Sequence, residues 1–217
     1  VYIAGSIGPS PGAIQADAGD TTFGIANDKV RDAHRRLATA LAEGGVDFFL
    51  IETQFSANEA AIVVDEARKQ GLPILVSMTY KYTKDRKSGE IVYKTDWGHS
   101  PASLLDALSS GEHSGGDDLI PYVNGIGLNC GAETREIEHT GMSYAVEGTA
   151  QLAKALADRS IEGKCLVAYP NAGMPQLDKK METVYSQSPE EMSGFLDDVL
   201  GVGAQFLGGC CGTGPEH

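Results

Sequence analysis

Six short apolar segments recur along the chain, and polar stretches with helical periodicity separate most of them. The segments expected to form β-strands are Val1–Ala4, Val46–Ile51, Pro73–Thr79, Gly125–Asn129, Lys164–Tyr169 and Gln205–Gly208. Short, nearly continuous apolar runs of this kind are typical of strands that are buried on both faces of a parallel sheet.

Helix signals lie between these strands. Ser56 with Glu59 and Ser188 with Glu191 have the spacing of a capping box, and Ser100-Pro101 is a typical helix start. The five expected helices begin near Asn27, Ser56, Ser100, Met142 and Ser188. Strands that alternate with helices in this way predict a parallel α/β fold.

Two longer segments break the alternation. We expect an exposed loop or hairpin over Tyr80–Gly98 and a long loop over Pro170–Gln187. The Lys-rich part of the first segment, Lys81–Lys87, is interpreted as a solvated loop, with a docking patch for another domain as the weaker alternative.

Most of the expected strands end in clusters rich in Gly, Cys, Asn, Glu or Thr. In parallel α/β folds the chemistry lies at the carboxyl ends of the strands, and a barrel brings all of these ends around one mouth. Clusters on so many strands therefore favour a barrel over an open sheet. No G-x-G-x-x-G motif follows the first strand, which argues against a dinucleotide-binding fold.

The charge balance excludes some partners. The 217 residues include 30 Asp plus Glu and 17 Lys plus Arg, which gives a formal net charge of −13. This acidity argues against non-specific nucleic-acid binding and against an anionic membrane surface. No apolar run approaches the ~20 residues of a membrane span, and no signal peptide is recognisable. We therefore expect a cytoplasmic protein.

Four cysteines are too few for a disulfide framework in a chain of this size, so reduced thiols are expected. Cys130 ends one strand, and the adjacent Cys210 and Cys211 follow another. Three thiolates that converge at a barrel mouth suit zinc with one open coordination position. The spacing is not that of a zinc knuckle, however, and buried cysteines are more often small core residues, so both interpretations stay open at this point.

Five motifs give the chain a family resemblance: Gly5-Ser6-Ile7-Gly8-Pro9, Ile51-Glu52-Thr53, Gly127-Leu128-Asn129-Cys130, Tyr169-Pro170-Asn171-Ala172-Gly173 and Gly208-Gly209-Cys210-Cys211-Gly212-Thr213-Gly214-Pro215-Glu216-His217. They resemble the homocysteine S-methyltransferase family, and in detail the homocysteine-binding barrel of cobalamin-dependent methionine synthase. The resemblance implies a (β/α)₈ barrel in which Cys130, Cys210 and Cys211 bind zinc.

The resemblance also implies an activity, which is methyl transfer to the thiol of homocysteine to give methionine. The substrate sulfur would take the open zinc position, where three thiolate ligands leave it electron-rich and nucleophilic. The expected donor is methylcobalamin carried by another domain or protein, while betaine and S-methylmethionine are donors of other relatives. The alternative from another class is a non-catalytic zinc-binding module with a closed metal site.

The remaining site predictions concern single residues. By resemblance, Glu52 binds the substrate ammonium, with a structural cap for the following loop as the alternative. Asn129 is expected to bind substrate, to orient the zinc site or to replace the substrate as a zinc ligand, and a turn-forming residue is the alternative. Asn171 is expected to be a turn residue and Cys165 a core residue. No catalytic histidine is expected, with a reservation for His99, which could approach the mouth.

The family barrel has eight strands, whereas six are recognised in this chain. We therefore expect residues 1–217 to form a partial homocysteine-binding barrel domain, with strands three to eight of the family present. The N-terminal strands and the last helix would be missing, and strands without partners at the two ends of the sheet would be unfavourable.

Overall fold

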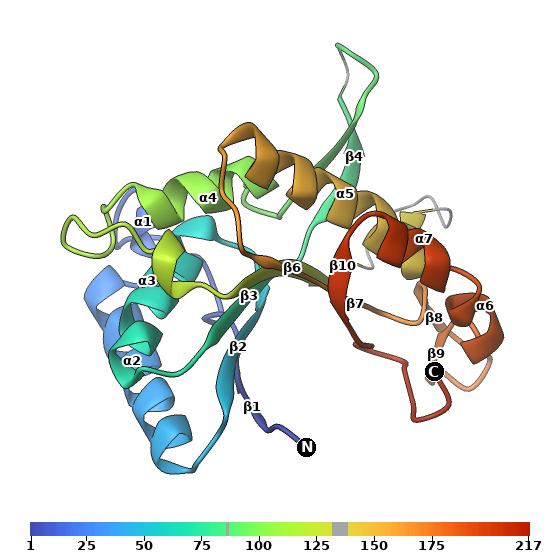
Figure 1. Ribbon diagram of the computed structural model, residues 1–217, viewed down its shortest axis with the longest axis horizontal. Helices are drawn as coiled ribbons and strands as arrows, with labels where there is room; N and C mark the ends of the chain where they lie inside the picture. Colours follow the sequence, from blue (N-terminus) through green and yellow to red (C-terminus); the bar gives the residue numbers. More distant parts are fainter. Residues whose placement is uncertain (86, 132–138) are drawn as a thin grey trace.

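Six parallel strands form one curved sheet in the computed structural model, which describes residues 1–85, 87–131 and 139–217 (Figure 1). The strand order is β1–β2–β3–β6–β7–β10. The bounds are β1 (Ala4–Ile7), β2 (Phe48–Gln54), β3 (Ile74–Met78), β6 (Gly125–Cys130), β7 (Cys165–Pro170) and β10 (Ala204–Leu207). All five pairings are parallel, which confirms the predicted α/β class.

The first strand begins later than predicted. The expected strand Val1–Ala4 is wrong in its bounds, because residues 1–3 lie exposed outside the sheet and β1 begins at Ala4. Its register explains the shift, since Ala4 pairs with Phe48, the first residue of β2. Ile3 is instead held by a bond from its backbone N–H to Asp47 Oδ2, at 2.6 Å.

The helices cover the outer, convex side of this curved sheet (Figure 1). The bounds are α1 (Gln15–Ala18), α2 (Asn27–Glu43), α3 (Ala57–Ala67), η1 (Arg68–Gln70), α4 (Pro101–Ser109), η2 (Ile120–Tyr122), α5 (Met142–Asp158), α6 (Pro189–Ser193) and α7 (Leu196–Gly201). The single helix expected after Ser188 is therefore divided into α6 and α7.

Two of the predicted helix starts have a complete capping box. Ser188 and Glu191 cap α6 reciprocally, and Ser100 forms the same arrangement with Ser103 at the start of α4. At α3, the Ser56 side chain accepts a bond from the backbone N–H of Glu59, as predicted. The Glu59 carboxylate is used elsewhere, because its Oε1 accepts a bond from the Ser10 N–H and lies 3.0 Å from His34 Nε2.

Each of the two long connections contains a hairpin. β4 (Lys81–Lys84) pairs with β5 (Ile91–Lys94), and its base is buried through Tyr80 and Tyr93. β8 (Pro175–Leu177) and β9 (Thr183–Tyr185) pair within the segment that was expected to be a loop. The proposed docking patch Lys81–Lys87 falls partly outside the described residues, since Arg86 is not described.

Alternate residues of the strands face the two sides of the sheet. On β3, Ile74, Val76 and Met78 belong to the large core beneath the helices, whereas Leu75 faces inward. The inward face forms a smaller cluster of Leu75, Val167 and Tyr169, with Phe48, Leu50 and Cys210 packed against it. A pocket of about 190 Å³ lies against this cluster and also contacts Phe206.

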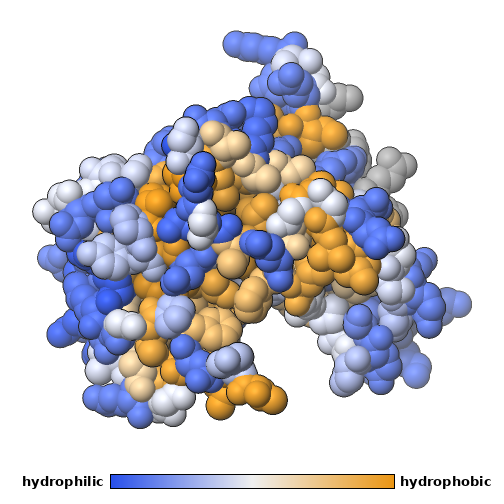
Figure 2. Space-filling view, viewed as in Figure 1, coloured by the Kyte–Doolittle hydropathy of each residue, from blue (hydrophilic) through white to orange (hydrophobic). Residues whose placement is uncertain are grey.

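Figure 2 shows the molecule hollowed between the N-terminal and C-terminal ends of the sheet, with hydrophobic side chains beside the hollow. In the part of the chain that the structure describes, no helix is both long enough and apolar enough to cross a membrane.

Candidate metal and substrate site

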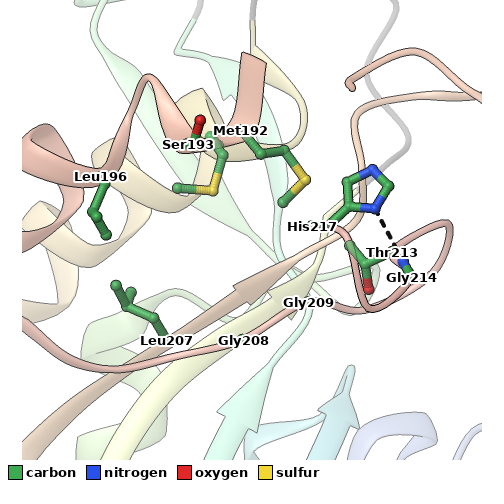
Figure 3. Close-up of a pocket in the computed structure, with 10 residues that line it drawn as sticks. Met192, Ser193, Leu196, Leu207, Gly208, Gly209, Thr213, Gly214 and His217 are labelled. Atoms are coloured by element: carbon green, nitrogen blue, oxygen red, sulfur yellow. Dashed lines mark hydrogen bonds between the residues drawn. The ribbon is translucent and has the colours of Figure 1, made fainter. Parts of the chain in front are cut away.

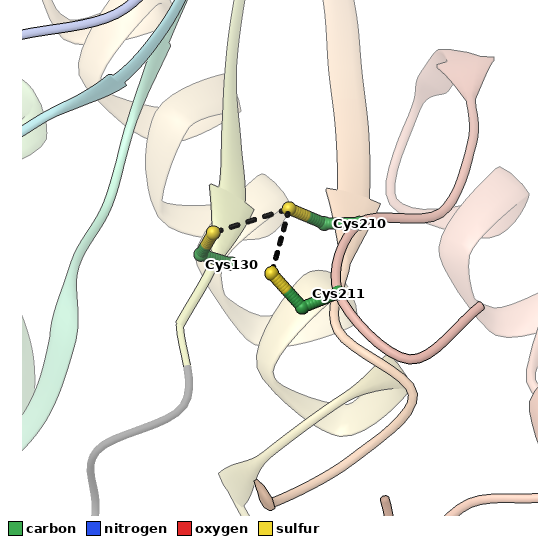
Figure 4. Close-up of side chains that lie close together, drawn as sticks. All are labelled: Cys130, Cys210 and Cys211. Carbon is green, nitrogen blue, oxygen red and sulfur yellow. Dashed lines mark hydrogen bonds between the residues drawn. The ribbon is translucent and has the colours of Figure 1, made fainter. Parts of the chain in front are cut away.

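Three sulfur atoms converge at the carboxyl end of the sheet (Figure 4). Cys130 is the last residue of β6, and Cys210 and Cys211 lie in the turn after β10. Cys130 Sγ is 3.1 Å from Cys210 Sγ, which is 3.9 Å from Cys211 Sγ, and all three lie within 4.8 Å of one another. The structure thus brings together the three cysteines that the sequence singled out.

The sulfur positions fit the chemistry of zinc. A tetrahedral ion with Zn–S bonds of ~2.3 Å holds its sulfur ligands roughly 3.8 Å apart. The Cys210–Cys211 separation of 3.9 Å is close to this value, and the Cys130–Cys210 separation of 3.1 Å is shorter. The three residues are half-buried or exposed rather than sealed in the core. Among the described residues, no further His, Cys, Asp or Glu side chain joins the cluster. Three protein ligands for a tetrahedral zinc are therefore available.

Without metal, the three thiols share protons unequally. The hydrogen bond from Cys130 to Cys210 raises the pKa of Cys130, and burial raises it further. The same bond lowers the pKa of Cys210. Burial, together with the charge of Cys210, raises the pKa of Cys211. Sulfurs packed this closely cannot all be anionic unless a cation compensates the charge, which is the electrostatic condition for a metal site.

A tight turn presents the two adjacent cysteines on the same side. The backbone N–H and the side-chain hydroxyl of Thr213 both bond to the Cys210 carbonyl, at 3.2 and 2.7 Å. A Cβ atom on Gly209 would lie 2.4 Å from Thr213 Oγ1, so this turn requires glycine there. Asn171 Oδ1 accepts a bond from the Cys211 N–H at 3.1 Å, in keeping with its expected role as a turn residue.

Asn129 connects the sulfur cluster to the end of β2. Its side chain is fully buried, and its Oδ1 accepts bonds from Ser77 Oγ at 2.7 Å and from the Thr53 N–H at 2.9 Å. Its Nδ2 donates to Thr53 Oγ1 at 2.8 Å and lies 3.5 Å from Cys130 Sγ and 3.9 Å from Cys210 Sγ. The amide therefore aims its remaining N–H toward the sulfur atoms.

The backbone is unusual on both sides of this amide. Thr53 and Cys130 have φ values of 57° and 55°, a left-handed conformation that is uncommon for residues with a Cβ and rare for a β-branched one. The register between β2 and β3 shifts between Ile51 and Gln54 at the same place. Such outliers persist only where surrounding contacts hold them, and they concentrate at functional sites. Here the two bonds from Asn129 hold Thr53.

Glu52 lies immediately before this irregularity and projects into the same inner layer. Its Oε1 accepts a bond from Ser6 Oγ at 2.5 Å, and the residue is partly exposed. A carboxylate held on one oxygen, with access from solvent, can bind a cationic group of a ligand.

The whole chain, residues 1–217, matches the homocysteine S-methyltransferase family. The protein belongs to this family. It is 28% identical over 224 residues to methionine synthase of Mycobacterium leprae (strain TN), a match that covers 100% of this chain and 15% of that protein. The chain thus spans about a seventh of the length of this relative.

Two solved structures of the homocysteine methyltransferase MmuM from Escherichia coli share the fold. The apo form has a TM-score of 0.61 at 18% identity, and the metallated form has a TM-score of 0.63 at 20% identity. Each comparison covers 99% of this chain and 59% or 58% of the other. At this level of identity the similarity concerns the fold, and it confirms a partial barrel of the homocysteine S-methyltransferase type.

The other predicted residues of this homocysteine S-methyltransferase family member lie outside the sulfur cluster. Cys165 begins β7 and is only half-buried, so it is less buried than the predicted core position implies. His99 binds the start of α3, because its Nδ1 accepts the Ala57 N–H at 2.8 Å. His34 is buried against Glu59.

A second pocket, of about 310 Å³, lies on the helix-covered side of β10 (Figure 3). Met192 and Leu196 from α6 and α7 face Leu207 across it, and His217 Nδ1 accepts a bond from the Gly214 N–H. None of the three cysteines lines this pocket.

The sequence analysis missed several inward-facing residues of the site. Ser6, Thr53, Ser77 and Tyr169 all lie near the carboxyl ends of strands, in the layer that contains Glu52 and Asn129. Strand alternation was the available signal, because Ser77 and Tyr169 have the same parity on their strands as the inward residues Leu75 and Val167.

Proposed function

We propose that this protein transfers a methyl group to the thiol of homocysteine and forms methionine, at a zinc ion held by Cys130, Cys210 and Cys211. The observation that carries the proposal is the convergence of these three sulfur atoms, with one coordination position open, in a chain of the homocysteine S-methyltransferase family. The metallated form of the related E. coli enzyme supports a metal in this fold.

Bound zinc would lower the pKa of the homocysteine thiol, so that the attacking sulfur is a thiolate at neutral pH. In the transfer, the bond from the donor to its methyl group breaks and the S–CH₃ bond forms, while the thiol proton leaves to solvent. The chain's own residues place this sulfur. The turn after β10 fixes two of the cysteines, and the remaining N–H of Asn129 faces the sulfur atoms.

We assign the substrate ammonium to Glu52, which lies in the same inner layer and has one oxygen held by Ser6. Asn129 contacts substrate only through its amide N–H, because Ser77 and Thr53 occupy its carbonyl oxygen. The two residues would therefore divide recognition between the ammonium end and the sulfur end of the amino acid.

For the donor, we propose methylcobalamin carried by another domain or protein. The match to a methionine synthase that is much longer than this chain favours it. Betaine and S-methylmethionine are the alternative donors. The closed zinc module is the second candidate function, but no fourth His, Cys, Asp or Glu ligand is present among the described residues.

The test is a methyl-transfer assay with zinc-loaded protein, homocysteine and each of the three donors in turn, in which methionine is measured by mass spectrometry. We expect methionine with methylcobalamin and none without zinc. Methionine formation with betaine or S-methylmethionine alone would overturn the donor assignment. A protein that binds zinc but does not bind homocysteine would support the closed module instead.

A further inference from the structure

Tyr169 carries a polar atom that the proposed chemistry does not yet use. It lies on β7 directly beside Asn129 of β6 in the parallel register, and its side chain belongs to the inward cluster that packs against Cys210. The residue is only 8% exposed. Its hydroxyl is buried and has no hydrogen-bond partner among the described residues.

The surroundings of this hydroxyl are anionic. Burial raises the pKa of the Tyr169 phenol, the Ser77 hydroxyl lowers it, and the negative charge of Glu52 raises it. A tyrosine phenol is in any case protonated at neutral pH and has a hydrogen to donate. Among the charged groups that act on it, Glu52 has the largest effect.

A buried hydroxyl without a partner costs free energy, and phenylalanine would fill the same space without that cost. The ring of Tyr169 already packs on Val167 and Leu75 at the apolar pocket, so packing alone requires no hydroxyl. An unsatisfied donor beside a carboxylate that is held on one oxygen only is therefore best explained by a bond that forms when the site is occupied.

We propose that Tyr169 is a positioning residue for ammonium recognition, which donates its hydroxyl to the Glu52 carboxylate when an amino-acid thiol occupies the site. Ser6 holds one oxygen of Glu52. With the second oxygen held by Tyr169, the remaining lone pairs of the carboxylate are directed at the ammonium. This inference rests on the proposed function, because it assumes that Glu52 binds the ammonium of homocysteine.

The test compares two thiols in the zinc-loaded protein: homocysteine, and 4-mercaptobutanoate, which lacks the amino group. In Tyr169→Phe we expect the affinity for homocysteine to fall roughly tenfold, the scale of a hydrogen bond to a charged group. The affinity for 4-mercaptobutanoate and the zinc content should stay unchanged. Equal weakening for both thiols would indicate a merely structural role and would overturn the inference.

Tyr80→Phe is the matched control. Tyr80 is also fully buried and its hydroxyl also lacks a partner among the described residues, but it belongs to the core beneath the helices. We expect both variants to melt no lower than the parent protein, and only Tyr169→Phe to lose affinity for homocysteine. The same loss in Tyr80→Phe would contradict the inference.

A double-mutant cycle shows whether Tyr169 acts through Glu52. In a Glu52→Gln background, Tyr169→Phe should have little further effect on homocysteine affinity, whereas fully additive losses would overturn the inference. If the parent protein binds neither thiol, the proposed function itself fails. If the parent protein binds homocysteine more tightly than 4-mercaptobutanoate and Tyr169→Phe keeps the same ratio of affinities, only the proposed role of Tyr169 fails.

Discussion

The two faces of the sheet differ in composition and in what they do. The outer face packs under the helices in one continuous apolar core, which includes Val76, Ile126 and Leu104 at 0% exposure. The inner face has a small apolar cluster next to a pocket, and toward the carboxyl ends of the strands its residues become polar: Ser6, Glu52, Ser77, Asn129 and Tyr169. Above this polar layer lie the three thiols.

This contrast separates stability from chemistry within the same strands. Each strand contributes alternate residues to the two faces. A substitution at one position therefore affects stability, whereas a substitution at the next position affects the site. Substitutions on the outer face should lower stability and leave the site chemistry unchanged in the folded protein. Substitutions in the polar layer should impair the site chemistry and leave the stability of the folded protein largely unchanged.

The largest effect is expected from the cysteines at the top of the inner face. Replacing Cys130, Cys210 or Cys211 with Ser should abolish stoichiometric zinc binding and methyl transfer, because each removes one of three thiolate ligands. Zinc content by elemental analysis is the measurement. Cys165→Ser is the control and should retain its zinc, because this cysteine lies outside the sulfur cluster. Full zinc content in Cys211→Ser would contradict the three-thiolate site.

The same substitution on the two faces sharpens the comparison. Leu104→Ala removes a fully buried side chain beneath the helices and should cost about 3 kcal/mol of unfolding free energy. Leu75→Ala, beside the inner pocket, should cost about 1–2 kcal/mol, because its surroundings are already open. Denaturant unfolding of the two variants measures the difference. Equal costs would show that the inner face is packed as tightly as the outer one.

The outer layer also carries a charged network, in which Asp65 on α3 bonds to Arg31 and Arg68. Burial alone would raise the pKa of Asp65, but the bonds from Arg68 and Arg31 outweigh it and lower the pKa. Asp65→Asn should therefore cost about 2–3 kcal/mol at pH 7, somewhat below the loss for a fully buried pair, because Arg31 is partly exposed.

The pH dependence of this loss has a defined sign. Because the pKa of Asp65 is lower in the folded than in the unfolded protein, its ionised carboxylate stabilises the fold at pH values above the unfolded pKa near 4. This stabilisation is lost as the pH falls through the pKa of the folded protein. The difference in stability between the parent protein and Asp65→Asn should therefore shrink below about pH 4. A difference that is constant from pH 7 down to pH 3 would exclude this contribution.

In the polar layer, the expected effect is on ligand affinity rather than on folding stability. Glu52→Gln should weaken homocysteine binding by roughly 1.5–3 kcal/mol, the scale of a charge-assisted hydrogen bond. Zinc affinity should barely change, since Glu52 contacts Ser6 rather than the sulfur atoms. Calorimetric titration of both ligands measures the two affinities. Loss of zinc and substrate together would point to a structural role for Glu52.

The sequence was informative where the signal is local or motif-based. The strand and helix alternation, the caps at Ser100 and Ser188, and the three cysteines are all evident from the sequence, and the structure confirms them. The start of β1 was misplaced because apolar side chains alone do not show where the partner strand begins.

The network around the thiols was not predictable in the same way. Asn129 forms hydrogen bonds with Thr53, which is 76 positions away in the sequence, and with Ser77, which is 52 positions away. Only the folded chain brings these residues together. The buried pair of His34 and Glu59 is likewise a tertiary contact, 25 positions apart, that overrides a capping-box pattern. Local pattern reasoning finds the residue types of a site more readily than the bonds that position them.

The central claim is that the three-thiolate site has an open position that accepts the thiol of homocysteine. The most direct measurement is a homocysteine titration of the cobalt-substituted protein, followed in the thiolate-to-cobalt charge-transfer absorption. We expect that one equivalent of homocysteine increases this band as a fourth sulfur enters the coordination shell. Full cobalt occupancy with a spectrum that homocysteine does not change would contradict an open site.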